Sequence, residues 1–220
     1  MDYKEISIVL SYCSSASIIL PILASILRFR DLTKGLRILA FYALVSFITD
    51  FSSLLVLEVF KSDNFIILHY FTFVEYGLLT LYYRSLSRNK NIRIFLVLSV
   101  AFFLLLDIIF SIIFKSIKAF DAYSTGIECI LMIFISLCYF YSIFKELRIV
   151  RLERDPSFWI NSGVLLYFAG TLFLFLCADI LLNSNKETYV KYWGINLIIN
   201  IIFSVFLAIG IWITPRRSST

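Results

Sequence analysis

Residues 94–114 read IFLVLSVAFFLLLDIIFSIIF, a run in which Asp107 is the only charged side chain. About 20 apolar residues in an α-helix cross the hydrocarbon core of a bilayer, so this run is long enough for one membrane-spanning helix. The whole chain has the same character: 60% of its 220 residues are hydrophobic, 16% are charged and its mean hydropathy is +0.91. Soluble chains are about 45–50% apolar and about 25% charged. A globule of this size has too little interior for the excess, so the composition indicates a membrane protein.

The chain contains seven apolar runs of about this length, each bounded by charged residues or by a helix breaker. They predict an all-α fold: one polytopic transmembrane domain over residues 1–220, built as a seven-transmembrane-helix bundle. Pro21 lies inside the first run and predicts a kink there. Pro156 suits the first turn of the sixth helix, with Asp155 as its N-cap. The predicted helices cover residues 6–27, 38–60, 65–83, 94–114, 122–144, 158–182 and 193–213.

Lys and Arg are distributed unequally between alternate loops. Fourteen of the 20, including every Arg, fall on the side that holds the loop after the first helix and the C-terminal tail. Cytoplasmic loops carry the Lys and Arg excess, so we expect the N-terminus outside and the C-terminus in the cytoplasm. Trp159 and Trp212 then fall at the inner interface and Trp193 at the outer one, where amphipathic rings settle.

Polar residues occur inside the predicted helices, although polar groups there are costly. The second through sixth helices each carry an acid well inside the run, the third also carries the single His, and the seventh carries two Asn residues, all in the outer half of the membrane. A charged group at mid-bilayer costs about 2.5–3.5 kcal/mol and usually faces the bundle interior. We therefore expect a polar cavity that opens outward. Its candidate ligand-binding residues are Asp50, His69, Glu75, Asp107, Glu128, Asp179, Asn196 and Asn200.

No Lys or Arg lies within any of the seven runs to balance these acids. Two carboxylates roughly 6 Å apart repel by about 3 kcal/mol at an effective dielectric near 20. Either most of the acids are protonated and hydrogen-bonded, or a cation, a cationic ligand or a mobile proton shares the site. A metal ion would use His69, Glu75 and Asp107, although one His among dispersed acids is a weak ligand set. In the structural alternative, each acid is a neutral hydrogen-bonding group that holds helices together.

The sequence lacks the residues that several classes of membrane protein require. Retinal binding needs a Lys in the middle of the last helix, and residues 193–213 have none. A zinc hydrolase needs several His, and a phosphate-binding loop needs a Gly-rich motif, neither of which is present. No motif indicates an enzyme, and no cofactor is expected. The loops are too short for a soluble domain, so nucleic acid is not an expected partner.

Two stretches, FWINSGVLLYFAGTLFLF at 158–175 and WGINLIINIIFSVFLAIGIW at 193–212, resemble segments of small multipass membrane proteins of Bacteroidota. The resemblance covers the last two predicted helices. Those proteins have no assigned chemistry and are often encoded beside sensor histidine kinases. The resemblance thus implies a role in sensing.

Together these observations predict a sensor or small-ligand-binding protein of the bacterial inner membrane. A small cationic ligand or a proton would enter the acidic cavity from outside and shift the helix packing. A separate signalling partner would read this shift at the short basic cytoplasmic loops. One alternative is a small proton- or cation-coupled transporter that uses the same acids. Another is a structural or assembly subunit of a membrane complex.

Overall fold

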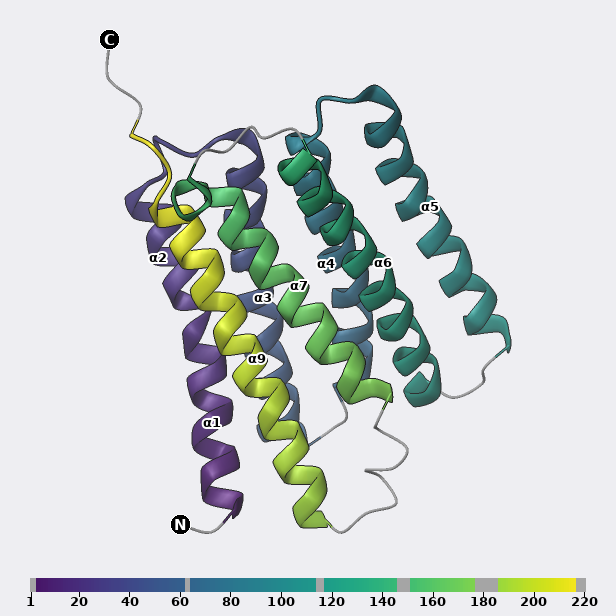
Figure 1. Cartoon of the computed structure of the whole chain (residues 1–220). Helices are drawn as coiled ribbons and strands as arrows, with labels where there is room; N and C mark the ends of the chain where they lie inside the picture. The colour runs from purple at the N-terminus through teal and green to yellow at the C-terminus, as the bar shows by residue number, and fades with distance from the viewer. Residues whose placement is uncertain (1–2, 62–63, 114–116, 146–150, 177–185, 217–220) are drawn as a thin grey trace. The chain divides into compact units, whose positions relative to one another are not determined.

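The computed structural model describes residues 3–61, 64–113, 117–145, 151–176 and 186–216, and no β-strand occurs among them (Figure 1). Each predicted run lies on a helix, and the first lies on two, so the all-α prediction is confirmed. Residue 114 of the fourth run and residues 177–182 of the sixth run lie outside the described residues. The elements are α1 (Tyr3–Ser17), α2 (Ile19–Leu27), α3 (Lys34–Glu58), α4 (Phe65–Leu86), α5 (Lys90–Ile113), α6 (Ile117–Lys145), the 3-10 helix η1 (Leu152–Arg154), α7 (Pro156–Leu176) and α9 (Lys186–Trp212).

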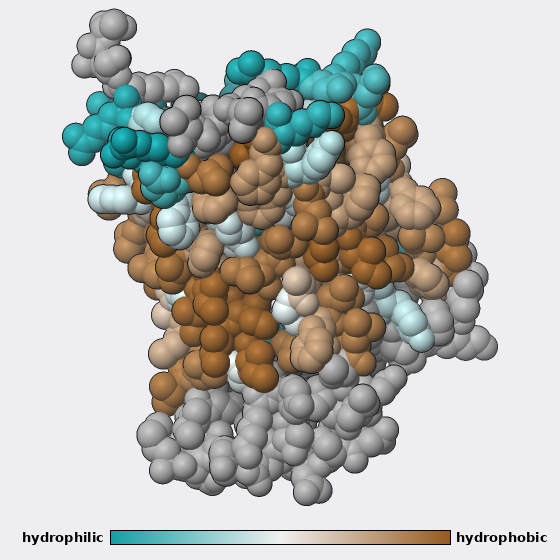
Figure 2. Space-filling model, in the orientation of Figure 1, coloured by the Kyte–Doolittle hydropathy of each residue, from teal (hydrophilic) through white to brown (hydrophobic). Residues whose placement is uncertain are grey.

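Within the described residues, six helical stretches are long and apolar enough to cross a membrane, and they imply contact with a lipid bilayer. The third predicted run, residues 65–83, forms α4, which is not among the six. Polar side chains such as His69 and Glu75 lower its hydropathy, so the seven-span count and the orientation of the termini stay predictions. Figure 2 shows that hydrophobic residues cover most of the coloured surface along the helices in this view. The six stretches are Val9–Leu27, Lys34–Leu57, Lys90–Phe110, Tyr123–Lys145, Pro156–Leu176 and Gly194–Trp212.

The helical structure is interrupted where Pro21 predicts a kink. α1 ends at Ser17 and α2 begins at Ile19. Pro21 has no N–H to donate to the carbonyl of residue 17, and its ring clashes with that carbonyl in a regular helix. At the end of α1, the Ser17 hydroxyl donates a 2.6 Å hydrogen bond to the carbonyl oxygen of Ser14. The break between α1 and α2 lies three residues before Pro21, where the kink was predicted.

The start of α7 also follows the sequence prediction. The helix begins at Pro156, and Oδ1 of Asp155 accepts hydrogen bonds from the backbone N–H groups of Ser157 at 2.6 Å and Phe158 at 3.1 Å. Asp155 thus satisfies two of the N–H groups that a helix start leaves without partners. The acid lies outside the predicted membrane run, where a charged cap is inexpensive.

The chain packs as two compact units. The first unit comprises Met1–Asp31 and Cys129–Thr220, and the second comprises Leu32–Glu128. The division falls inside α6, between Glu128 and Cys129. The prediction of one domain over residues 1–220 is not tested by this division, because a single transmembrane bundle can contain two such units.

In the first unit, α9 packs against α7 and against the pair α1 and α2. Helices α7 and α9 are antiparallel: a Cβ on Gly163 would meet Phe206 at 2.7 Å, and one on Gly170 would meet Ile199 at 2.6 Å. Small residues let the two backbones approach closely, which is how helices associate in lipid. Large side chains fill the rest of this contact. The fully buried ones are Ile160, Phe168, Phe203, Leu207 and Ile211.

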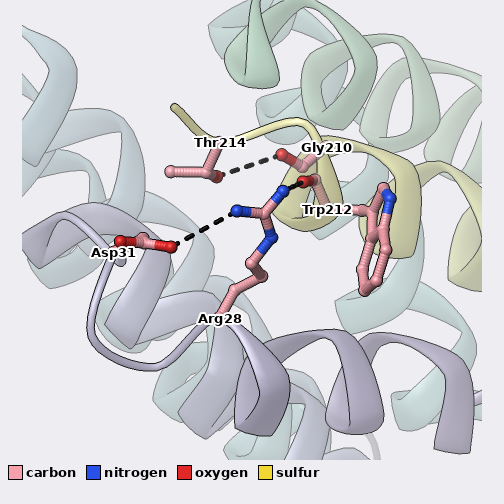
Figure 3. Close-up of polar contacts among 5 residues, drawn as sticks. All are labelled: Arg28, Asp31, Gly210, Trp212 and Thr214. Atoms are coloured by element: carbon pink, nitrogen blue, oxygen red, sulfur yellow. Dashed lines mark hydrogen bonds and ion pairs between the residues drawn. The ribbon is translucent and has the colours of Figure 1, made fainter. Parts of the chain in front are cut away.

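The ends of α2 and α9 are joined by the side chain of Arg28 (Figure 3). Its Nη2 donates a 2.9 Å hydrogen bond to the carbonyl oxygen of Trp212, which closes α9, and its guanidinium lies 5.3 Å from the centroid of the Trp212 ring. Its Nη1 lies 3.3 Å from Oδ2 of Asp31. A cation at a helix C-terminus binds carbonyls that have no partner within the helix.

In the second unit, α3 and α4 form an antiparallel hairpin, and α5 packs on α4. The hairpin core contains Leu39, Tyr76, Leu79 and Tyr82, each fully buried. Phe103 of α5 joins it, with its ring centroid 4.8 Å from that of Tyr76. This packing buries Ser46 of α3, Glu75 of α4 and Ser99 of α5.

Candidate functional site

Glu75 of α4 lies at the contact with α3. Its side chain is almost fully buried, at 4% exposure. Its Oε1 accepts a 2.6 Å hydrogen bond from the hydroxyl of Tyr42 on α3. Asp50, two turns further along α3, is an electrostatic neighbour of Glu75. The structure therefore brings two of the predicted acids together on one helix pair.

A second polar group links α4, α5 and α6. Oδ1 of Asp107 on α5 accepts a 2.6 Å hydrogen bond from the Ser124 hydroxyl on α6, and its Oδ2 lies 3.7 Å from Nε2 of His69 on α4. The side chains of His69 and Asp107 are 13% and 12% exposed. Phe73 contacts the His69 ring edge to face, with 5.1 Å between the ring centroids. One acid thus connects three helices.

Glu128 of α6 belongs to the same unit and is 2% exposed. Tyr76, which follows Glu75 on α4, is an electrostatic neighbour of Glu128. The Tyr76 hydroxyl donates a 2.9 Å hydrogen bond to Ser99 on α5. Four of the predicted acids and His69 therefore lie in the second unit, on the four helices α3 to α6.

Hydroxyl groups are the partners that sequence reasoning missed. The hydrogen bond from Tyr42 to Glu75 was not foreseen from the sequence. Ser124 lies four residues before Glu128, and Ser99 lies eight before Asp107, so each shares a helix face with an acid. This spacing was the feature of the sequence that could have indicated these hydroxyl groups as partners of the acids.

The predicted amides lie in the first unit. Nδ2 of Asn200 on α9 donates a 3.0 Å hydrogen bond to the Ser14 hydroxyl on α1, so Asn200 joins two packed helices. Asn196 is half-buried one turn earlier on α9. Whether either residue acts with the acids stays a prediction. Asp179 lies outside the described residues.

Asn161 of α7, also in the first unit, has a structural role. It is fully buried, and its Oδ1 accepts a 2.8 Å hydrogen bond from the Ser136 hydroxyl on α6. Its Nδ2 donates to the Ser136 carbonyl oxygen at 3.2 Å. This pairing satisfies the amide, so Asn161 offers little to a transport path through the predicted inner half of the membrane.

The metal alternative gains no support from the described residues, because no three His, Cys, Asp or Glu side chains among them are grouped to hold a metal ion. His69 and Asp107 lie together, whereas Glu75 is bonded to Tyr42. The chain matches no protein-family model, no curated protein and no solved structure in the three comparisons made. The arrangement of the residues themselves is therefore the basis for a functional proposal.

Proposed function

We propose that this protein is a membrane sensor in which acids on α3 to α6 bind a small cationic ligand or a proton. The observation that carries the proposal is buried Glu75, bonded to neutral Tyr42 and close to Asp50. No Lys or Arg occurs in residues 38–60, 65–83, 94–114 or 122–144 to balance these acids. We place the site in the half of the membrane nearer the outside, with the N-terminus outside and the C-terminus in the cytoplasm of a bacterial inner membrane.

Electrostatics supports a shared positive charge. Neighbouring carboxylates repel each other more strongly between packed helices than in water, because the effective dielectric is lower there. Burial adds to this cost, because a carboxylate loses the water that stabilises its charge. A cation or a proton between Asp50 and Glu75 removes the repulsion. The site is thus suited to a positively charged ligand.

The contacts of Asp107 suggest how binding would change the helix packing. Asp107 accepts from Ser124 and lies beside His69, so its two oxygens are directed at two other helices. A cation that binds Asp107 would compete with His69 and loosen the link to α4. Such a ligand stabilises the helix packing that it binds more tightly. A signalling partner bound at the basic cytoplasmic loops would respond to this change in packing.

The hydrogen bonds to neutral hydroxyls also favour a second function, that of a structural or assembly subunit. In that case Tyr42 with Glu75 and Ser124 with Asp107 hold helices together and bind nothing else. Interhelical hydrogen bonds of this kind contribute about 0.6 kcal/mol on average. The two functions differ in their response to added cations.

A thermal-shift experiment separates them. The detergent-purified protein is heated with sodium, zinc or tetramethylammonium ions over a range of pH, alongside Glu75→Gln and Asp107→Asn. Glu153→Gln, an exposed acid in η1, is the matched control. A sensor site predicts that at least one cation raises the unfolding temperature of the wild type and the control but not of the two site variants. Equal responses in all four proteins would exclude the sensor site.

A further inference from the structure

One end of the second unit is strongly basic. It lies where α3 begins, α4 ends and α5 begins. No Asp or Glu occurs in residues 32–49 or 76–106, which include this end. We call this surface the basic end, and its residues are Lys34, Arg37, Arg84, Arg88, Lys90 and Arg93.

The packing of the hairpin brings these residues together. Gly35, in the first turn of α3, lies against Tyr82 and Ser85 in the last turns of α4. α4 ends at Leu86 and α5 begins at Lys90, so a short connection keeps the start of α5 at the same end. Every residue of the basic end is exposed except Arg84, which is half-buried. The Nε of Arg84 has no hydrogen-bond partner among the described residues.

Two helix starts add to the positive potential. α3 and α5 both begin at the basic end, and neither has an acidic residue in its first turn. The N-terminus of a helix carries a partial positive charge and free N–H groups, which favour anions. At the start of α3 the Thr33 hydroxyl accepts from the Leu36 N–H at 3.4 Å, so only part of this N–H set is satisfied.

Apolar side chains lie next to these charges on the outer surface. On α5, three apolar side chains near Lys90 and Arg93 are 46–51% exposed. Ile92 lies between the two cations in the sequence, and Ile94 and Phe95 directly follow Arg93. On α3, Phe41 is 55% exposed just over one turn after Arg37. Exposed apolar residues beside a cluster of cations match the boundary between the acyl chains and the phosphates of a bilayer.

In the first unit, several described cations lie beside acids: Arg28 is paired with Asp31, and Arg154 lies between Glu153 and Asp155. Mixed charges of this kind attract an anionic surface much less than an unbroken set of cations does. The two units therefore provide an internal comparison.

We propose that the basic end binds the headgroups of anionic phospholipids. The cations and the two helix starts contact the phosphates, while the exposed residues of α3 and α5 contact the acyl chains. This binding is independent of the proposed sensor site. It fixes the second unit to the anionic lipid of the surrounding bilayer.

The test uses full-length protein in detergent, titrated with short-chain phosphatidylglycerol or with phosphatidylcholine of the same chain length. The unfolding temperature reports binding. The test variant is Arg88→Gln/Lys90→Gln/Arg93→Gln. The control variant, Arg30→Gln/Arg151→Gln/Arg154→Gln, removes three exposed charges from the first unit. A basic residue near an anionic lipid surface contributes about 1 kcal/mol, so the test variant should lose about a hundredfold in apparent affinity for phosphatidylglycerol.

The proposal expects that the wild type prefers phosphatidylglycerol, that the control variant keeps this preference within about threefold, and that 1 M salt weakens it. If the triple variant does not fold, the single variants at the same three positions should each lose about fivefold. Equal loss in the test and control variants would overturn the proposal, because it would show a general charge effect. A stabilisation by inorganic phosphate or polyglutamate as large as that by phosphatidylglycerol would also overturn it, since the surface would then not recognise lipid.

Discussion

The Tyr42 hydroxyl on α3 donates a 2.6 Å hydrogen bond to Oε1 of Glu75 on α4, and both side chains are buried. This hydroxyl therefore links α3 to α4 through Glu75, the acid on which the proposed site depends. An interaction of this kind stabilises the fold and also sets the position of a ligand-binding group.

Replacing Tyr42 with Phe should destabilise the protein by about 1–3 kcal/mol, because Glu75 then loses a hydrogen-bond partner inside a packed contact. The measurement is the free energy of unfolding in mixed micelles. Tyr141→Phe is the control: Tyr141 is 65% exposed, and a Phe ring preserves its contact with Lys145. The assigned role of Tyr42 fails if both variants lose the same small amount.

His69 and Asp107 should be energetically coupled. A double-mutant cycle with His69→Gln and Asp107→Asn is expected to give a coupling energy of about 1 kcal/mol, since their side chains meet and are both mostly buried. Thr33→Ala provides a reference, because Thr33 caps α3 at the basic end and Asp107 lies about 25 Å along α5 from that end. Asp107→Asn and Thr33→Ala should therefore be additive. An additive result for His69 and Asp107 would show that their contact has no energetic consequence.

The close contact between α7 and α9 makes Gly210 sensitive to substitution. A Cβ at this position would lie 2.8 Å from the carbonyl oxygen of Pro156 and 2.5 Å from Cγ1 of Ile160. Since the backbone oxygen cannot rotate away, Gly210→Ala should cost about 1–3 kcal/mol. Gly77→Ala has open space around the added atom and should instead stabilise by about 0.5–1 kcal/mol, because Ala restricts the unfolded chain. Thermal unfolding of the two variants should shift in opposite directions; a shared direction would contradict the packing described here.

The contact of Arg28 with the end of α9 should require a guanidinium. Arg28→Gln is expected to cost about 1 kcal/mol, and Arg28→Lys should not restore it, because an ammonium cannot bond both Trp212 and Asp31 while stacking on the ring. Arg30→Gln, a change at an exposed neighbour, should have no measurable effect. Chemical unfolding of the three variants provides the comparison. Full recovery with Lys would indicate that charge alone matters.

Most of the fold could be predicted because a helix that crosses a bilayer needs about 20 apolar residues. Runs of this length predicted the α-helices, with one run covering both α1 and α2. Pro21 indicated the break between those two helices, and Asp155 indicated the start of α7. Helix ends were less accurate, because α3 and α5 begin at Lys34 and Lys90, four residues before the apolar runs that predicted them. The arrangement in two units could not be predicted, because the pattern of apolar residues does not specify which helices pack together.

The candidate site was predicted as a set of acids but not as a set of contacts. Asp50 and Glu75 were both predicted in the outer half of the membrane, and in the structure they are electrostatic neighbours. The hydroxyl partners were missed because Ser and Tyr occur on many helix faces, and only packing selects the ones that meet an acid. The hydrogen bond between Asn200 and Ser14 was likewise not predicted, and the grouping of Asn200 with the acids stays a prediction.

Infrared difference spectroscopy tests the central claim most directly, because it detects carboxyl groups themselves. Spectra of the purified protein are recorded before and after the addition of the cation that most stabilises it, or after a pH step. We expect a change in the carboxyl or carboxylate bands of the wild type that is lost in a Glu75→Gln/Asp107→Asn variant and kept in Glu153→Gln. Carboxyl bands that stay constant under every cation and pH, or that change equally in all three proteins, would contradict the account.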